Sequence, residues 1–186
     1  MPRVITVLHN DHQNVLVLLQ LLDPLASKLA PGTPADFVPI LDIMNYMTRY
    51  SDLFHHPTEE LVFKKLIERD VSAGPLVAKL TLEHKILGEK GGQLLHSVRN
   101  VVNGFVPHEG GPASKCKDYV TTLRRHMSWE ENEVFPLASK LLIDDDWGAI
   151  ERGLVARTDP LFGTGREAEY MALYNHIVAA AELRIA

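Results

Sequence analysis

Residues 55–69 read HHPTEELVFKKLIER, a run in which apolar side chains recur every three to four positions. This spacing predicts an amphipathic α-helix. Within the run, His56 is followed four residues later by Glu60, and residues at this separation lie on one face of a helix. The stretch therefore presents an imidazole and a carboxylate to one point, which is half of a metal site.

The same step recurs on another predicted helix, where residues 126–136 read HMSWEENEVFP and His126 precedes Glu130. A single His-x-x-x-Glu carries little weight, because short motifs arise by chance. Two further histidines, His12 and His84, fall on the apolar faces of two other predicted helices. Four helices are thus expected to contribute one imidazole each.

Helical spacing of apolar residues continues through almost the whole chain, and the alternation typical of strands is missing. We predict an all-α fold, an up-down-up-down four-helix bundle with an additional C-terminal helix. The four long helices are expected to end near residues 29, 69, 102 and 142. Pro57 and Pro136 should interrupt or bend the second and fourth of them, because proline removes a backbone donor. Residues 1–142 would form the bundle, and residues 143–186 a helical extension packed on it.

The 186 residues suit one domain with a sizeable core, since 46% are hydrophobic and 23% are charged. The net charge is −5 and the basic residues are scattered, so the footprint of a nucleic-acid binder is missing. The single cysteine, Cys116, excludes an internal disulfide and cysteine-based metal motifs. The most apolar run, residues 15–22, is too short to cross a bilayer, and residues 1–12 do not resemble a secretory signal. We expect a cytoplasmic protein with no membrane partner.

Imidazole and carboxylate together suit iron, manganese or zinc. The candidate ligands are four nitrogens and two carboxylates: His12, His56, Glu60, His84, His126 and Glu130. Six ligands are more than one tetrahedral zinc ion binds, and they match the number needed by two ions bridged by the two glutamates. Buried carboxylates without partners cost several kcal/mol each, and a bound cation offsets that cost.

Two alternatives stay open from the residues alone. The six groups could be separate polar residues with ordinary partners. In addition, His55 and Glu59 repeat the four-residue step about 100° around the same helix, so this pair rivals His56 and Glu60.

The segments HHPTEE (55–60), Glu83-His84 and HMSWEENEVFP (126–136) together resemble the signature of hemerythrin-like, or HHE cation-binding, domains. The similarity covers about residues 1–142, and the stretch DPLFG (159–163) adds weaker support. The resemblance implies a non-haem di-iron centre in a four-helix bundle: two iron ions, Fe²⁺ or Fe³⁺, joined by an oxo or hydroxo bridge when oxidised. It also implies that the six residues above are the ligands, favours His56 over His55, and makes Glu60 and Glu130 the bridges.

The chain departs from oxygen-carrying hemerythrins at two places. Those proteins have a second histidine one turn from the third-helix ligand, where this chain has Leu80 and Gly88, and an aspartate where this chain has Glu131. Loss of the fifth imidazole should leave the irons more open, which argues against simple oxygen carriage.

We therefore expect a di-iron protein that binds or senses oxygen, peroxide or nitric oxide. The alternatives are an enzyme-like role, in iron donation for iron-sulfur cluster repair or in peroxide turnover, and an iron-responsive interaction module. Nothing in the sequence names a protein partner.

Overall fold

A computed structural model describes residues 1–27, 37–105, 111–154, 158–164 and 168–185. Its described residues form helices and connecting turns, with no strand among them. The predicted all-α fold is therefore confirmed. Within the described ranges, no helix combines the length and the apolar character needed to span a bilayer.

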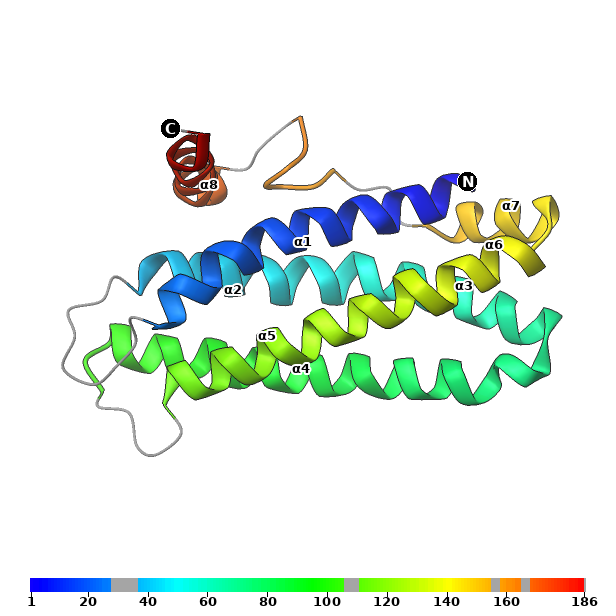
Figure 1. Cartoon of the computed structure of the whole chain (residues 1–186), viewed down its shortest axis with the longest axis horizontal. Coiled ribbons are helices and arrows are strands. Elements are labelled where there is room, and N and C mark those ends of the chain that lie inside the picture. The colour runs from blue at the N-terminus through cyan, green and yellow to red at the C-terminus, as the bar shows by residue number, and fades with distance from the viewer. Residues whose placement is uncertain (28–36, 106–110, 155–157, 165–167, 186) are drawn as a thin grey trace.

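Four long helical segments lie side by side, and the chain reverses direction from each one to the next (Figure 1). The first and third segments are single helices, α1 (Arg3–Ser27) and α4 (Gly74–Val102). The second consists of α2 (Val38–Tyr50), the π-helical turn η1 (Ser51–His55) and α3 (His56–Arg69). The fourth consists of α5 (Pro112–Trp129), the π-helical turn η3 (Glu130–Val134) and α6 (Phe135–Leu141).

Both π-helical turns come directly before a proline-containing α-helical start, at Pro57 and Pro136. Proline offers no N–H, and its ring clashes with the carbonyl four residues back, so the preceding turn widens. At η3 the N–H of Phe135 accordingly donates to the carbonyl of Glu130, five residues earlier. The interruptions expected at these prolines are thus π-turns, a feature found frequently at functional sites.

The interior is divided into two apolar clusters. One contains Leu8, Phe63 and Leu80, and the other contains Val15 and Leu87. Along α1 and α4, the residues between these clusters are His12 and His84, both buried. A polar layer therefore crosses the bundle between two apolar layers that shield it from water.

The C-terminal residues lie against the outside of the bundle. Helix α7 (Asp144–Gly153) contacts α1 and α3, and α8 (Met171–Ile185), preceded by the short turn η4 (Ala168–Tyr170), contacts α1 and α2. The division into a bundle of residues 1–142 and an extension of residues 143–186 stays a prediction.

Candidate metal centre

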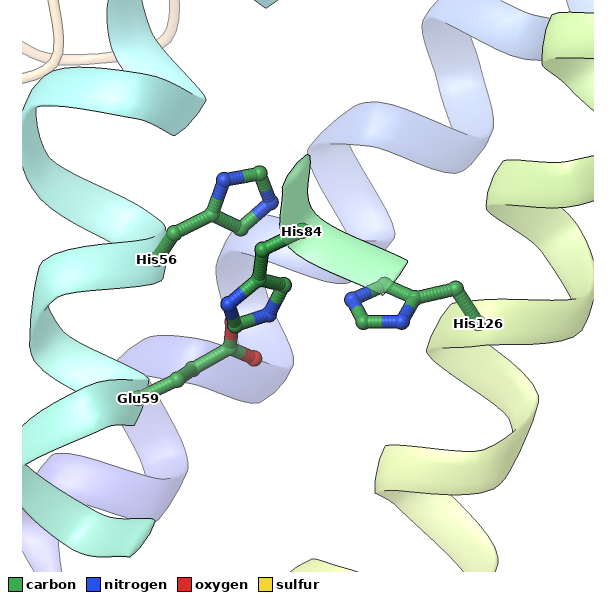
Figure 2. Close-up of side chains that lie close together, drawn as sticks. All are labelled: His56, Glu59, His84 and His126. Atoms are coloured by element: carbon green, nitrogen blue, oxygen red, sulfur yellow. The ribbon is translucent and has the colours of Figure 1, made fainter. Parts of the chain in front are cut away.

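Histidine and glutamate side chains from all four segments meet in the polar layer. Figure 2 shows His56 and Glu59 from α3, His84 from α4 and His126 from α5 directed toward one another. Their donor atoms lie within 4.8 Å of one another, as do those of a second group made of His12, His55 and Glu59. Glu59 belongs to both groups, so the two groups share one carboxylate.

The two oxygens of Glu59 face different histidines. Its Oε1 lies 3.2 Å from Nε2 of His55 and 3.7 Å from Nε2 of His12. Its Oε2 lies 3.3 Å from Nε2 of His84. One carboxylate therefore points one oxygen into each half of the cluster.

Glu130 repeats this arrangement from the opposite segment. Its Oε2 lies 3.4 Å from Nε2 of His12, whereas its Oε1 lies 3.1 Å from Nε2 of His126 and 3.5 Å from Nε2 of His84. Two carboxylates that each span both halves are what a pair of bridged cations requires. The geometry thus places Glu59 and Glu130 each between the two groups of imidazoles.

Several of these atoms have no hydrogen-bond partner in the protein. They are both oxygens of Glu59, both oxygens of Glu130, and Nε2 of His84 and His126. The side chains of both glutamates are 0% exposed, so bulk water does not reach these oxygens. Burying ionised carboxylates in this way costs several kcal/mol each unless a counter-charge is present. The donor set therefore fits a bound cation.

The His12 side of the centre supports the same conclusion. Nε2 of His12 and Nε2 of His55 lie 3.1 Å apart, and the Nδ1 atom of each ring faces a carboxylate that accepts its proton. Both Nε2 atoms are thereby directed toward the same point. Two nitrogens bound at about 2.1 Å to one metal at a right angle would lie about 3.0 Å apart, which matches the observed spacing.

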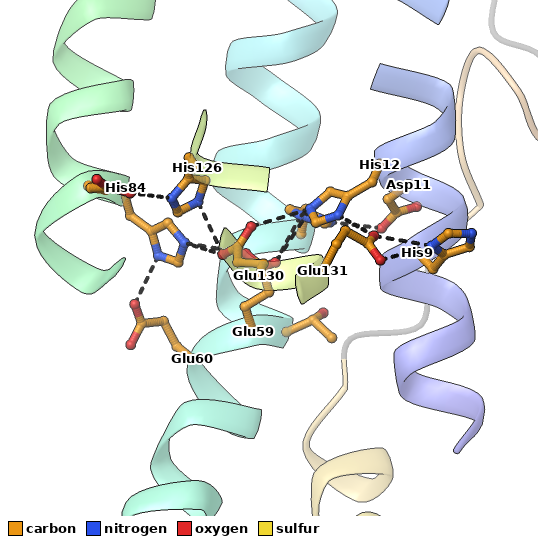
Figure 3. A network of polar contacts seen from close by, with 12 residues as sticks. His9, Asp11, His12, Glu59, Glu60, His84, His126, Glu130 and Glu131 are labelled. Carbon is orange, nitrogen blue, oxygen red and sulfur yellow. Dashed lines mark hydrogen bonds and ion pairs between the residues drawn. The ribbon is translucent and has the colours of Figure 1, made fainter. Parts of the chain in front are cut away.

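A carboxylate accepts the Nδ1 proton of four of the imidazoles. Figure 3 labels both partners for His12 with Glu131 and for His84 with Glu60. The pairs are His12 with Glu131 at 2.7 Å, His55 with Asp11 at 3.1 Å, His84 with Glu60 at 3.0 Å, and His126 with Glu83 at 3.1 Å. Such carboxylates fix the tautomer that leaves Nε2 free for a metal and orient the ring toward it. The imidazoles are therefore arranged as ligands before any ion binds.

The charges of the cluster shift the titration of its members. Burial by itself would lower the pKa of His55, but Glu59 and Asp11 outweigh it and raise the pKa to about 10. Burial is likewise outweighed at His84, where Glu130 and Glu59 raise the pKa to about 10. Burial and the charge of Glu130 would raise the pKa of Glu59, but His55 and His84 lower it. Without a metal ion, protons on the histidines therefore neutralise the charge of the two carboxylates, and metal binding would release these protons.

Five of the six residues predicted from the sequence converge at this centre: His12, His56, His84, His126 and Glu130. Glu60 does not. Its side chain is 42% exposed, and it accepts hydrogen bonds from Thr81 and from Nδ1 of His84 at the edge of the site.

The structure corrects the expected face of this helix, because Glu59 takes the inward position assigned to Glu60. The π-turn η1 ends at His55 and rotates the following α-helix relative to a continuous one. As a result, both His55 and His56 reach the cluster. Of the two alternative pairs, both histidines but only one glutamate, Glu59, lie in the centre.

The sequence did not identify which histidines two of the orienting carboxylates serve. Asp11 serves His55, and Glu83 serves His126. Each acidic residue directly precedes a converging histidine of its own helix, His12 or His84. An acidic residue followed by an inward-facing histidine was therefore a usable signal, although the histidine that the carboxylate serves lies on another segment.

The comparisons with known proteins agree with the site and the fold. The chain matches the hemerythrin HHE cation-binding domain over residues 3–138, a range that contains every residue of the centre. No curated protein and no solved structure matches it. Since the match covers most of the chain, this protein belongs to the hemerythrin HHE cation-binding family.

Proposed function

We propose that this protein holds two iron ions between Glu59 and Glu130 and binds a small ligand there: oxygen, peroxide or nitric oxide. The observation that carries the proposal is that each buried carboxylate divides its two unpartnered oxygens between two groups of imidazoles. Bound iron would supply electrons and an open position for the ligand.

The donor set favours iron over zinc. Five imidazoles and two carboxylates exceed the four ligands of a tetrahedral zinc site, and mixed nitrogen and oxygen donors suit iron. The chain's own residues then have distinct tasks. Glu59, Glu130 and the five imidazoles would hold the ions, and the apolar layers on either side keep bulk water away. The single cysteine accords with a cytoplasmic location, which is part of this proposal.

Anaerobic loading with ferrous iron tests the function. We expect close to two irons per chain and a change in near-ultraviolet absorption when oxygen, nitric oxide or peroxide is added. The matched control is the His96→Gln variant, since His96 is exposed and lies on α4 far from the Nε2 cluster, three turns beyond His84. One zinc per chain after purification, or no spectral change with any of the three ligands, would contradict the proposal.

One contact favours a second candidate function, iron donation. Glu131 joins the buried ring of His12 to the exposed ring of His9, whose side chain is 42% exposed. This links one ligand of the centre to solvent through a 29% exposed carboxylate. An iron donor should release its iron to a chelator faster than a His9→Gln variant, which keeps Glu131 on His12, whereas equal release rates would remove this option.

A further inference from the structure

An open pocket lies beside the π-turn η1, on the outside of the bundle. Its volume is about 330 Å³, which is in the range of pockets that bind small molecules. The bundle contributes Arg49, Tyr50, Leu53 and Phe54 to its walls, and the C-terminal residues contribute Pro160, Glu169 and Tyr170. The pocket therefore lies where the C-terminal residues pack against the second segment of the bundle.

Three aromatic side chains line this pocket. Tyr50 and Tyr170 are each 5% exposed and belong to the apolar core, and Phe54 packs against the same core. The ring centroids of Tyr50 and Phe54 lie 5.7 Å apart. Leu53 and Pro160 add apolar surface. Because aromatic rings pair favourably with other rings, these walls suit a planar ring as the ligand.

The charged groups of the pocket neutralise each other. Among its described lining residues, the charged ones are Arg49 and Glu169, and Nη1 of Arg49 lies 3.1 Å from Oε1 of Glu169. The two side chains are 63% and 53% exposed, so the ion pair lies at the rim, where such pairs contribute little to stability and rearrange readily. A nucleotide phosphate would meet a cation that already has a counter-charge. The pocket thus suits an uncharged ring whose carbonyl oxygens accept a hydrogen bond at the rim.

An apolar groove continues from this pocket toward the end of α7. A neighbouring pocket of about 40 Å³ shares Leu53 and Phe54 with it. The walls of this neighbour also include Pro57, Leu61 and Leu154, and none of its described lining residues is charged. A ligand that joins a planar ring to an apolar tail would place the tail here, because the groove removes apolar surface from water.

Tyr50 connects the pocket with the metal centre. Its ring lines the pocket, and its hydroxyl donates to Oδ1 of Asp11 at 3.3 Å. Oδ2 of the same carboxylate accepts the Nδ1 proton of His55 at 3.1 Å. A ligand in the pocket therefore contacts Tyr50 rather than the ions. Electron exchange needs no direct contact with a metal, so it is the reaction that this position permits.

The proposed function requires a source of electrons. A centre oxidised by oxygen or peroxide holds two ferric ions, and two electrons must return before it binds these ligands again. The single cysteine, Cys116, cannot supply them as a dithiol. A quinol can, because its oxidation to a quinone releases two electrons and two protons. Each ferric ion takes up one electron, and the protons pass to water.

We propose that this pocket binds a quinol, a planar two-electron carrier with an apolar tail, and that the bound quinol reduces the diferric centre across Tyr50. The inference rests on the proposed function and names the electron donor of that site. The ring lies between Tyr50, Phe54 and Tyr170, and the tail follows the groove toward Leu61.

The first test measures binding of the oxidised ring and needs no iron chemistry. Duroquinone, a fully methylated quinone that forms no adducts with thiols, is dialysed to equilibrium against the protein as purified and after iron removal. Leu53 is 63% exposed and lines the pocket, so Leu53→Trp should fill it and weaken binding at least about tenfold. The matched control is Leu82→Trp, since Leu82 is 56% exposed on α4 and does not line the pocket. It should bind duroquinone as wild type does.

Two results of the dialysis would overturn the proposal. One is equal binding of duroquinone by wild type, Leu53→Trp and Leu82→Trp, which would place the quinone elsewhere. The other is retention of lumiflavin without retention of duroquinone, which would assign the pocket to flavins.

The second test follows the electrons. Iron-loaded protein is oxidised, made anaerobic and mixed with duroquinol, and stopped-flow absorbance records the loss of the ferric bands. We expect one quinol to be consumed per two irons, at a rate at least about tenfold lower in Leu53→Trp and unchanged in Leu82→Trp. Equal rates in all three proteins, each carrying the same iron content, would overturn electron supply through this pocket.

The two tests separate the pocket from the iron chemistry. Failure of the chain to bind iron contradicts the proposed function, whereas the dialysis still decides whether the pocket takes the ring. Duroquinone binding that is lost in Leu53→Trp, together with reduction of the irons at the wild-type rate in that variant, overturns the quinol proposal even when two irons are bound.

Discussion

One oxygen of Glu59 lies 3.2 Å from Nε2 of His55, one helical turn earlier in the chain. The other oxygen lies 3.3 Å from Nε2 of His84. The next residue, Glu60, contacts the opposite nitrogen of His84, Nδ1, from a side chain that is 42% exposed. Adjacent glutamates thus occupy different positions around one imidazole, Glu59 inside the centre and Glu60 outside it.

This contrast predicts different results for two isosteric substitutions. Glu59→Gln should reduce the iron content from two ions per chain to one or fewer, because both halves of the centre lose a charged oxygen. Glu60→Gln should keep two ions and weaken their binding by about 10–100-fold, the usual effect of losing a carboxylate that orients a ligand histidine. Metal analysis and chelator competition measure the two effects.

The outcome also tests which glutamate bridges. The opposite result would be loss of iron in Glu60→Gln and two irons per chain in Glu59→Gln. It would show that Glu60 is the bridge and that the side chains of Glu59 and Glu60 exchange positions when iron binds. Circular dichroism of both variants should match that of wild type, which confirms that each variant is folded.

The helical fold and most of the centre could be predicted because they depend on local spacing. His12 and His84 interrupt apolar stripes of period 3.6, so their inward direction follows from helix geometry alone. His126 and Glu130 lie at the end of α5 and the start of η3, where the helical register still holds. For these residues, each local pattern agrees with the tertiary structure.

Glu59 could not be distinguished from Glu60 in the same way. The π-turn at Ser51–His55 shifts the following helix by a fraction of a turn, and Pro57 indicates that an interruption occurs but not its direction. The histidine partners of Asp11 and Glu83 could not be predicted from the sequence either. Each carboxylate serves a histidine at a sequence separation of 44 or 43 residues. Only the packing of the segments brings such groups together.

Removal of the metal should destabilise the fold strongly. A ligand present at about 1,000 times its dissociation constant stabilises the folded state by about 4 kcal/mol. For a chain of this size, 1 kcal/mol corresponds to about 2–4 °C in Tm, so chelation should lower Tm by about 10 °C. Adding ferrous iron back should restore it. Chelator saturated with calcium is the control, and a melt that does not move under chelation would be evidence that the centre is empty in the purified protein.

Gly163 should be intolerant of any side chain. Its N–H donates to the carbonyl of Asp159 at 2.9 Å, and a Cβ there would overlap with that same carbonyl oxygen and approach Thr158. This turn fixes Asp159, whose Oδ2 accepts a hydrogen bond from Tyr46 in the core at 2.9 Å. Gly163→Ala should therefore lower the free energy of unfolding by about 1–3 kcal/mol.

The control for this change is Gly92→Ala in the exposed interior of α4. Its added Cβ meets nothing, so it should be neutral or stabilise the protein by up to about 1 kcal/mol through helix propensity. Urea unfolding of the two variants gives both values. A Gly163→Ala protein as stable as wild type would mean that the turn adjusts without cost.

The attachment of α7 to the bundle should depend on pH. Arg69 of α3 donates through Nε to Asp146 at 2.7 Å and through Nη2 at 3.1 Å. The Arg69 hydrogen bond lowers the pKa of Asp146 below its ordinary value. A carboxylate with a lowered pKa stabilises the folded state above its unfolded pKa, about 3.9 for aspartate, and this contribution is lost as the pH falls through the folded pKa. Asp146→Asn should therefore melt below wild type at pH 7.

The difference in Tm between Asp146→Asn and wild type should then shrink as the pH is lowered below about 4. Asp145→Asn is the matched control, because Asp145 lies in the same first turn of α7 but is exposed. It removes the same charge from the same helix end without touching Arg69. A gap for Asp146→Asn that stayed constant down to pH 3 would show that the stabilisation does not depend on the charge of Asp146. An equal gap for Asp145→Asn would assign the stabilisation to the helix dipole rather than to the pair with Arg69.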